Sequence, residues 1–178
     1  VPEGNLAGVV HHGIPQERFR LERGPREYLS FIGRMTDQKR PDRAIALAQA
    51  VNVPIRLAGP IDPGNPTYFD RTVAPLLGDT VSYLGSLTDA EKQGFFGRSQ
   101  ALVFPIDWPE PFGLVMIEAM ACGTPVIAWN RGSVPEVVED GVTGIVVDTL
   151  EEAIARFGEV RSLDPVTIRQ RFEERFSA

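Results

Sequence analysis

The chain has 178 residues, 43% of them hydrophobic, and a formal net charge of -6 at pH 7. This length and composition suit one globular domain with a sizeable core. The negative charge argues against a general nucleic-acid-binding protein, because such proteins neutralise phosphates with clustered lysine and arginine. The single cysteine, Cys122, excludes an internal disulfide and favours a reducing compartment.

The first residues, VPEGNLAGVVHHGIP, lack the basic region and apolar core of a signal peptide. No apolar run approaches the roughly 20 residues that a membrane-spanning helix needs. We therefore expect a cytoplasmic protein with no nucleic-acid partner. The chain does not begin with methionine, which predicts a piece of a longer protein.

Six apolar runs rich in β-branched and aromatic residues alternate with segments of helical periodicity. The predicted strands are residues 28–33, 54–59, 80–85, 101–105, 125–129 and 144–148. The predicted helices are residues 41–51, 67–77, 88–99, 114–122, 133–140 and 165–178. This alternation predicts an α/β fold, with a Rossmann-like parallel sheet covered by helices on both faces.

Several predicted helices carry local signals at their amino termini. Pro41 is permitted in the first turn of a helix, and Thr88 is expected to cap the helix that follows it. Ser133 and Glu136 have the spacing of a capping box. The sequence does not indicate which surface the helix of residues 165–178 packs against.

Ligands of such sheets bind outside the carboxyl ends of the strands, beside the amino termini of helices. The loop GRMTDQKRPD after the first strand places Gly33, Arg34 and Lys39 there. Two cations beside helix amides suit a phosphate or diphosphate. Taken alone, these cations fit a solvated surface loop better. Neither a Walker loop nor a G-x-G-x-x-G fingerprint occurs, so phosphate binding would need another arrangement.

The segment EPFGLVMIEAMACGTPVIA, residues 110–128, supplies such an arrangement. Flanking prolines keep Glu110 out of a helix, and the Phe-Gly-Leu sequence leads the chain into one. The backbone amides of this turn can face an anion, and Gly113 has no side chain to block its approach. Glu118 lies about one turn further on, where its carboxylate could accept hydrogen bonds from a vicinal diol such as ribose.

Glu110 could bind hydroxyls at the other end of the same ligand, which would then be a diphosphate between two hydroxyl-bearing rings. Each glutamate alone could equally be an ordinary charge on a loop or an exposed helix. Their combination with Arg34 and Lys39, at equivalent strand ends, favours the ligand.

These motifs resemble the carboxyl-terminal, nucleotide-sugar-binding domain of GT-B retaining glycosyltransferases of group 1 (family 4), which include sucrose and glycogen synthases. The resemblance covers nearly the whole chain. It rests on VVHHGIPQERF, GRMTDQK, VSYLGSLTDAEK, EPFGLVMIEAMACGTPVIA and GSVPEVVEDGVTGIVV. The specific part is the pair of glutamates that have seven residues between them, Phe-Gly included.

The resemblance implies roles for individual residues. Arg34 and Lys39 match cations that bind the diphosphate and stabilise the departing nucleotide, and Glu110 matches a glutamate that contacts the transferred sugar. Glu118 matches the glutamate that holds the ribose hydroxyls. The amides of Phe112, Gly113 and Leu114 match contacts to donor hydroxyls and phosphate. Leu87 and Lys92 match residues that line the base pocket.

Other residues receive structural roles. His11 and His12 stand where the family more often has Asn-Gly, and we expect them to pack or to contact another domain. Cys122 is expected in the core and Trp108 in loop packing. Ser133 lies on a loop that is near the sugar in the family, but a helix cap accounts for it.

The resemblance implies retaining transfer of a hexose-type sugar from a UDP-, GDP- or ADP-sugar to an acceptor hydroxyl. It implies no cofactor and no metal ion, and the sequence has no D-x-D motif. Residues 1–178 would form the nucleotide-sugar-binding domain, with residues 1–27 as a linker-side segment. The acceptor would bind an amino-terminal domain outside this chain, so we expect the chain alone to transfer no sugar. Peripheral contact of the longer enzyme with a membrane stays open.

Two other interpretations stay open. A non-catalytic module that senses sugar nucleotides could use the same site, although it would tolerate the loss of a sugar contact that this chain retains. An isomerase of GT-B architecture, such as a sugar-nucleotide epimerase, would need a different pattern of acidic and histidine groups, which this sequence does not show. The base, the sugar and the acceptor are not specified by the sequence.

Overall fold

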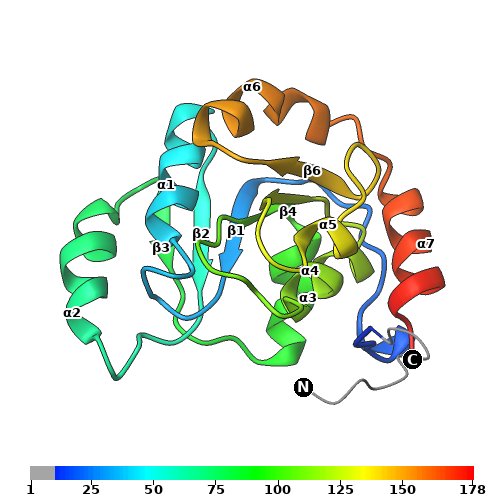
Figure 1. Ribbon diagram of the computed structural model, residues 1–178, viewed down its shortest axis with the longest axis horizontal. Coiled ribbons are helices and arrows are strands. Elements are labelled where there is room, and N and C mark those ends of the chain that lie inside the picture. The colour runs from blue at the N-terminus through cyan, green and yellow to red at the C-terminus, as the bar shows by residue number, and fades with distance from the viewer. Residues whose placement is uncertain (1–10) are drawn as a thin grey trace, which may run out of the picture.

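The computed structural model describes residues 11–178, which form one parallel sheet between two layers of helices (Figure 1). The strands are β1 (Tyr28–Ile32), β2 (Ile55–Ala58), β3 (Val81–Tyr83), β4 (Ser99–Phe104), β5 (Val126–Trp129) and β6 (Gly144–Val147). The helices are α1 (Pro41–Ala50), α2 (Pro66–Tyr68), α3 (Asp89–Gly97), α4 (Leu114–Ala121), α5 (Val134–Val137), α6 (Leu150–Val160) and α7 (Pro165–Phe176). Three short turns complete them, namely η1 (Gln16–Arg18), η2 (Phe69–Val73) and η3 (Ala74–Leu76). The predicted α/β fold is confirmed.

The strands lie in the order β3-β2-β1-β4-β5-β6, and all neighbours are parallel. The chain builds the sheet outward from β1 in one direction, then returns to place β4 on the other side of β1. At such a switch point the loops that leave two adjacent strands diverge, and a crevice opens at their carboxyl ends. The loops after β1 and β4 are those that carry the predicted phosphate and glutamate motifs.

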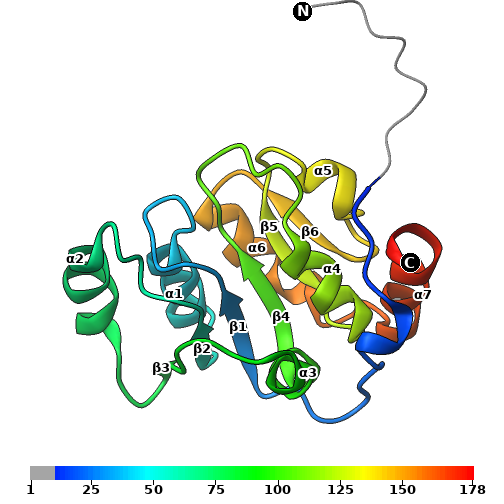
Figure 2. The same ribbon diagram turned by 90° about the horizontal axis from the view of Figure 1, so that it is seen from below.

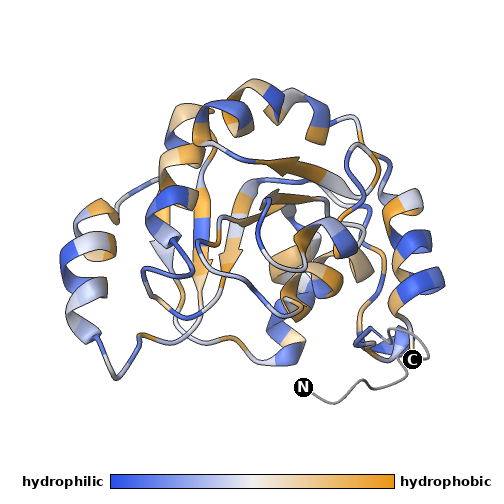
Figure 3. Cartoon of the chain, in the orientation of Figure 1, coloured by the Kyte–Doolittle hydropathy of each residue, from blue (hydrophilic) through white to orange (hydrophobic). Residues whose placement is uncertain are grey.

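Alternate residues of each strand face the two helical layers. In β4, Ala101 and Val103 pack with the core under α1 and α6, whereas Leu102 and Phe104 pack with the core under α3, α4 and α7. Figure 2 shows these helices on opposite sides of the strands. In Figure 3 the hydrophobic colour is concentrated on the strands and α4, while α7 carries broad hydrophilic segments. Within the described residues, no helix combines the length and apolar character needed to cross a membrane.

Helix α7 packs against α4 and against the part of the linker-side segment that the structure describes, residues 11–27. Arg169 on α7 donates hydrogen bonds to the carbonyl oxygens of Phe19 and Ala121, each at 2.7 Å. The backbone of Ile14 also pairs with that of Ser177. These contacts identify the packing surface of α7 that the sequence left open, and they join the two ends of the described chain.

The predicted capping box at Ser133 and Glu136 is wrong, whereas the predicted cap at Thr88 is confirmed. Ser133 Oγ donates a hydrogen bond to the carbonyl oxygen of Phe112 at 2.9 Å, and α5 has no side-chain cap. A buried carbonyl needs a donor, so this long-range contact replaces the local one. Thr88 caps α3 together with Glu91, in a complete capping box.

The predicted helix at residues 67–77 is divided into α2, a π-helical turn and a 3-10 turn. Pro75 lies in the last of these and has no amide hydrogen to continue a regular helix.

Sequence analysis missed α6, although the chain carries its signals. The Thr149 side chain accepts a hydrogen bond from the amide of Glu152, as an amino-terminal cap does. Ala153, Phe157 and Val160 are buried at helical spacing.

Cys122 lies in the core, as predicted, with no exposed surface. Burial disfavours the thiolate and raises the pKa of the Cys122 thiol to about 12. The thiol therefore stays neutral around neutral pH, which fits a packing role.

A close approach between the ends of β1 and β2 generates the first prediction. Gly59 has a φ of +121°, and a Cβ atom there would lie 2.0 Å from the carbonyl oxygen of Gly33. We expect Gly59→Ala to lower the free energy of unfolding by about 3 kcal/mol or more, because both the backbone conformation and the contact become unfavourable. Gly141→Ala is the control, since Gly141 also has positive φ but has no atom within 4 Å of the added Cβ.

Gly141→Ala should lower the free energy of unfolding by only about 1 kcal/mol, which is the cost of the left-handed conformation alone. Urea denaturation measures both variants. Equal losses would show that the contact with Gly33 does not constrain this edge of the sheet.

Candidate functional site

The predicted site residues gather at the carboxyl edge of the sheet. Helices α1, α3 and α4 each follow a strand, so their amino termini and free amides lie at this edge. The β1–α1 loop carries Arg34 and Lys39, and α3 carries Lys92. Glu110 lies on the β4–α4 loop and Glu118 within α4. The fold thus places three separate sequence segments at one edge.

Lys39 and Glu110 contact each other directly across the switch point. Lys39 Nζ forms an ion pair with Glu110 Oε2, and the same oxygen accepts a hydrogen bond from Trp108 Nε1 at 2.9 Å. The Lys39 ammonium lies 5.0 Å from the centroid of the Trp108 ring, within range of a cation–π interaction. Side-chain exposure is 24% for Lys39 and 12% for Glu110. Trp108, which sequence analysis assigned to loop packing, is therefore also a hydrogen-bond donor in the site.

A second set of contacts holds the two loops together. Arg40, which has a left-handed φ of 53°, donates hydrogen bonds to Asp42 in α1 and to Asp107 after β4. The amide of Asp107 donates a hydrogen bond to the carbonyl oxygen of Gln38 at 2.8 Å. Burial favours the neutral form of Asp42, but hydrogen bonds from Arg40 and Tyr68 outweigh it and hold the pKa of Asp42 below its ordinary value. Sequence analysis missed the contact between Arg40 and Asp107, because no local pattern joins charges 67 positions apart.

Arg34 is the more accessible of the two predicted phosphate cations. Its side chain is 61% exposed, and its Nη1 lies 3.9 Å from Asp62 Oδ1. Arg34, Lys39, Asp62 and Trp108 line part of a cavity of about 470 Å³. A long ion pair at an exposed site is weak, so the Arg34 guanidinium is free to turn towards a bound anion.

The second glutamate of the motif is also paired. Lys92 Nζ lies 3.0 Å from each carboxylate oxygen of Glu118. The Glu118 side chain is 7% exposed and that of Lys92 is 18% exposed. Sequence analysis assigned these two residues to different parts of a ligand, and the structure brings them into contact. Each carboxylate oxygen has more than one acceptor position, so the ion pair leaves Glu118 able to accept from a hydroxyl.

The Phe-Gly-Leu turn opens α4 as the sequence predicts. Gly113 is the N-cap residue, with a φ of 77°. A Cβ atom on Gly113 would lie 3.0 Å from the Phe104 ring and 2.8 Å from the terminal carbon of Met116. Glycine is therefore required by backbone conformation and by packing, in addition to leaving the helix terminus open. Leu114 follows with 46% of its surface exposed.

Phe112 is buried beneath the linker-side segment. The rings of His11 and His12 lie 6.0 and 5.1 Å from the Phe112 ring, which agrees with the predicted packing role of both histidines. The other predicted contact residues are placed less definitely, since Leu87 is half-buried against the core and Gly33 contributes backbone only. Within residues 11–178, no group of three or more His, Cys, Asp or Glu side chains is arranged to hold a metal ion.

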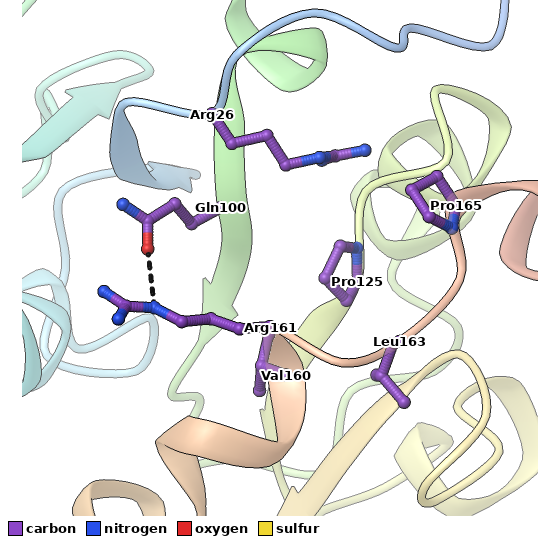
Figure 4. A pocket seen from close by; sticks show the side chains of 7 residues that line it. All are labelled: Arg26, Gln100, Pro125, Val160, Arg161, Leu163 and Pro165. Atoms are coloured by element: carbon purple, nitrogen blue, oxygen red, sulfur yellow. Dashed lines mark hydrogen bonds between the residues drawn. The ribbon is translucent and has the colours of Figure 1, made fainter.

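A separate pocket of about 390 Å³ lies at the opposite, amino-terminal edge of the sheet (Figure 4). Its lining residues are Arg26, Gln100, Pro125, Val160, Arg161, Leu163 and Pro165. Arg26 is engaged there with the carbonyl oxygens of Ser99 and Gly123 and the hydroxyl of Thr124. None of the predicted site residues lines this pocket, so it is not the predicted ligand site.

The family model for glycosyl transferases group 1 matches residues 14–164. D-inositol 3-phosphate glycosyltransferase of Streptomyces bingchenggensis (strain BCW-1) is 35% identical over 168 residues, covering 80% of this chain and 36% of that relative. The protein of the same name from Mycobacterium sp. (strain KMS) is 32% identical over 156 residues, covering 79% of this chain and 35% of that relative. The chain thus spans about a third of the length of these curated relatives.

Solved structures share the fold. AviGT4, a glycosyltransferase involved in avilamycin A biosynthesis, has a TM-score of 0.78 at 24% identity, over 98% of this chain and 55% of that one. Anabaena Alr3699/HepE in complex with UDP and glucose has a TM-score of 0.79 at 21% identity, over 96% of this chain and 53% of that one. The carboxyl-terminal domain of LpcC, a glycosyl transferase group 1 family protein from Francisella tularensis, has a TM-score of 0.76 at 18% identity, over 93% and 99%. The six-stranded sheet and its helices match GT-B Rossmann-like domains.

The Lys92–Glu118 pair generates the second prediction. Lys92→Met leaves the Glu118 carboxylate nearly buried beside no matching cation, and we expect a loss of about 2 kcal/mol in the free energy of unfolding. Adding Glu118→Gln should recover most of this loss, because the uncompensated charge is then removed. Arg131→Met is the control, since its partner Asp148 is 65% exposed and an exposed pair of this kind contributes little to stability. If the double variant is no more stable than Lys92→Met, the charge of Glu118 is not what Lys92 compensates.

Proposed function

The chain belongs to the glycosyl transferases group 1 family, and we propose that its described domain binds the nucleoside-diphosphate sugar from which the enzyme transfers a hexose. The observation that carries this proposal is the convergence at the β1/β4 switch point. A cation from the first loop, Lys39, there meets a carboxylate from the second loop, Glu110. A ligand with phosphates and hydroxyls uses both kinds of group.

In the proposed complex the diphosphate lies between the amino termini of α1 and α4. Arg34 and Lys39 contact its oxygens, and the amides of the first turn of α4 supply further donors. Glu110 accepts hydrogen bonds from hydroxyls of the transferred sugar, and Glu118 accepts them from the ribose. This arrangement assigns every charged residue of the motif to one ligand.

The proposed chemistry follows from the leaving group. Breaking the anomeric C–O bond leaves negative charge on the nucleoside diphosphate and positive character on the sugar. Cations and helix amides already directed at the phosphates stabilise that charge as it develops, which lowers the barrier. We propose that Arg34 and Lys39 carry out this task in place of a metal ion, and that the transfer retains the anomeric configuration. Glu110 positions the donor and is not assigned as a glycosidase-like nucleophile.

Binding of nucleoside diphosphates tests the proposal first. We expect calorimetric titration with UDP, GDP and ADP to show binding of one of them. UDP is titrated first because Anabaena Alr3699/HepE, which shares the fold, was solved in complex with UDP. Arg34→Ala combined with Lys39→Ala should weaken that binding about 100-fold, since each charge-assisted contact contributes about 1.5 kcal/mol or more.

The control variant combines Arg23→Ala with Arg161→Ala, which removes the same charge away from the site. Arg161 lines the pocket at the opposite edge of the sheet, and Arg23 lies near Asp164. If both variants weaken nucleotide binding equally, the effect arises from the change in net charge and not from contacts at the site. Absence of binding by all three nucleotides at millimolar concentration would contradict the proposed site in this chain.

A turnover assay tests whether the donor and the acceptor are bound by different parts of the longer protein. The chain spans about a third of its curated relatives, and we propose that the acceptor is bound outside it. We therefore expect the purified chain to release no nucleotide above background from UDP-glucose when D-inositol 3-phosphate is offered as acceptor. A longer protein that contains this domain should transfer sugar, whereas a sensing module would not do so. Measured transfer by the purified chain itself would refute the division.

A further inference from the structure

One carboxylate oxygen of Glu110 has two donors of different kinds. Oε2 accepts from the charged ammonium of Lys39 and from the neutral indole N–H of Trp108. In the proposed function, Lys39 and Glu110 contact different parts of the donor. While they are paired with each other, the charge of Lys39 is already compensated. A diphosphate therefore competes with Glu110 for the Lys39 ammonium, and its higher charge draws Lys39 away from Glu110.

Glu110 is the more restrained partner, because its backbone is held on both sides. Its carbonyl oxygen accepts a hydrogen bond from the Ser133 amide at 3.0 Å, and its own amide donates to the carbonyl oxygen of Trp108 at 2.9 Å. Gly132 approaches so closely that an added Cβ would lie 2.4 Å from Glu110 N. Lys39, by contrast, has a long flexible side chain that ends beside the aromatic ring of Trp108. The lysine is the partner that can move.

Once Lys39 has moved, Glu110 is a partly buried carboxylate that needs another donor. A carboxylate in this position loses much of its hydration and is costly to leave without a partner. The Trp108 indole N–H satisfies this need from a ring packed against the core. Because the indole is neutral, a phosphate does not attract it away from the carboxylate.

We infer that Trp108 is a positioning residue that keeps the Glu110 carboxylate aimed at the sugar after Lys39 has moved to the diphosphate. This inference rests on the proposed function and extends it to a residue that the motif does not include. Lys39 exchanges partners on binding, and Trp108 does not. Trp108 thus acts on recognition of the sugar moiety, through Glu110, and has little effect on recognition of the diphosphate.

Paired ligands test this role. Trp108→Phe keeps an aromatic ring beside Lys39 and removes only the N–H donor. We expect it to weaken binding of the sugar nucleotide about tenfold, and that of the matching nucleoside diphosphate by less than about twofold, as loss of one charge-assisted hydrogen bond implies. The probes are UDP with UDP-glucose, GDP with GDP-mannose and ADP with ADP-glucose. Tyr28→Phe is the control, since it removes an aromatic donor that binds the Phe95 carbonyl at the opposite edge and should leave the ratio unchanged.

A second measurement needs no ligand. The chain contains two tryptophans, Trp108 and the fully buried Trp129, so an ¹⁵N spectrum shows two indole signals, which Trp108→Phe assigns. Lys39→Met imitates departure of the lysine. We expect the Trp108 indole proton to remain protected from solvent exchange in Lys39→Met and to lose protection in Glu110→Ala, with Trp129 as the internal reference.

The outcomes separate the two proposals. If the unaltered chain binds none of the six probes, the proposed function fails, and the indole measurement alone decides whether Trp108 holds Glu110 without Lys39. If the chain binds them but Trp108→Phe leaves the ratio of sugar nucleotide to diphosphate unchanged, the inference fails and the proposed function stands. Loss of indole protection in Lys39→Met would overturn the inference by itself.

Discussion

The reversal of strand order between β1 and β4 is the constraint on which the rest of the site depends. Helix α1 lies on one face of the sheet and α4 on the other, so the loops that lead into them diverge from adjacent parallel strands. Divergence alone would leave two separate loops. Arg40 binds Asp107 across the gap, and Asp107 binds the backbone of Gln38, so that the loops keep one relative position. That position places Lys39 against Glu110.

The charged residues of the site form ion pairs with one another. Both glutamates of the motif are paired with a lysine from another element, Glu110 with Lys39 and Glu118 with Lys92. Such pairing compensates the charge of the nearly buried carboxylates without a ligand, at the expense of the affinity that free cations would provide. In the proposed complex a diphosphate competes with Glu110 for Lys39, whereas Glu118 can accept a further hydrogen bond without losing Lys92. This competition offsets part of the free energy that the new contact of Lys39 contributes.

The linker-side segment and α7 extend the site towards the ends of the described chain. Ile14 pairs with Ser177, and Arg169 fixes α7 to the backbone of Phe19. The rings of His11 and His12 cover Phe112, directly before the turn that opens α4. Displacement of this segment would therefore alter the packing of Phe112, which lies in the loop that also carries Glu110. The packing connects the margin of the domain with the edge of the sheet that carries the proposed site.

The sequence by itself determined the class of fold, because strand and helix periodicities are local. It also determined which segments reach the carboxyl edge, because a helix that directly follows a strand of a parallel sheet begins there. It also supplied the cap at Thr88 and the turn at Gly113, which depend on neighbouring residues only. The tertiary structure alone decided which charges meet. The Lys39–Glu110 pair joins residues 71 positions apart, and Trp108 becomes a donor to Glu110 only once the loop has folded around it. Ser133 shows the same limit, since its capping pattern was local but the buried carbonyl of Phe112, which it binds instead, lies 21 positions away.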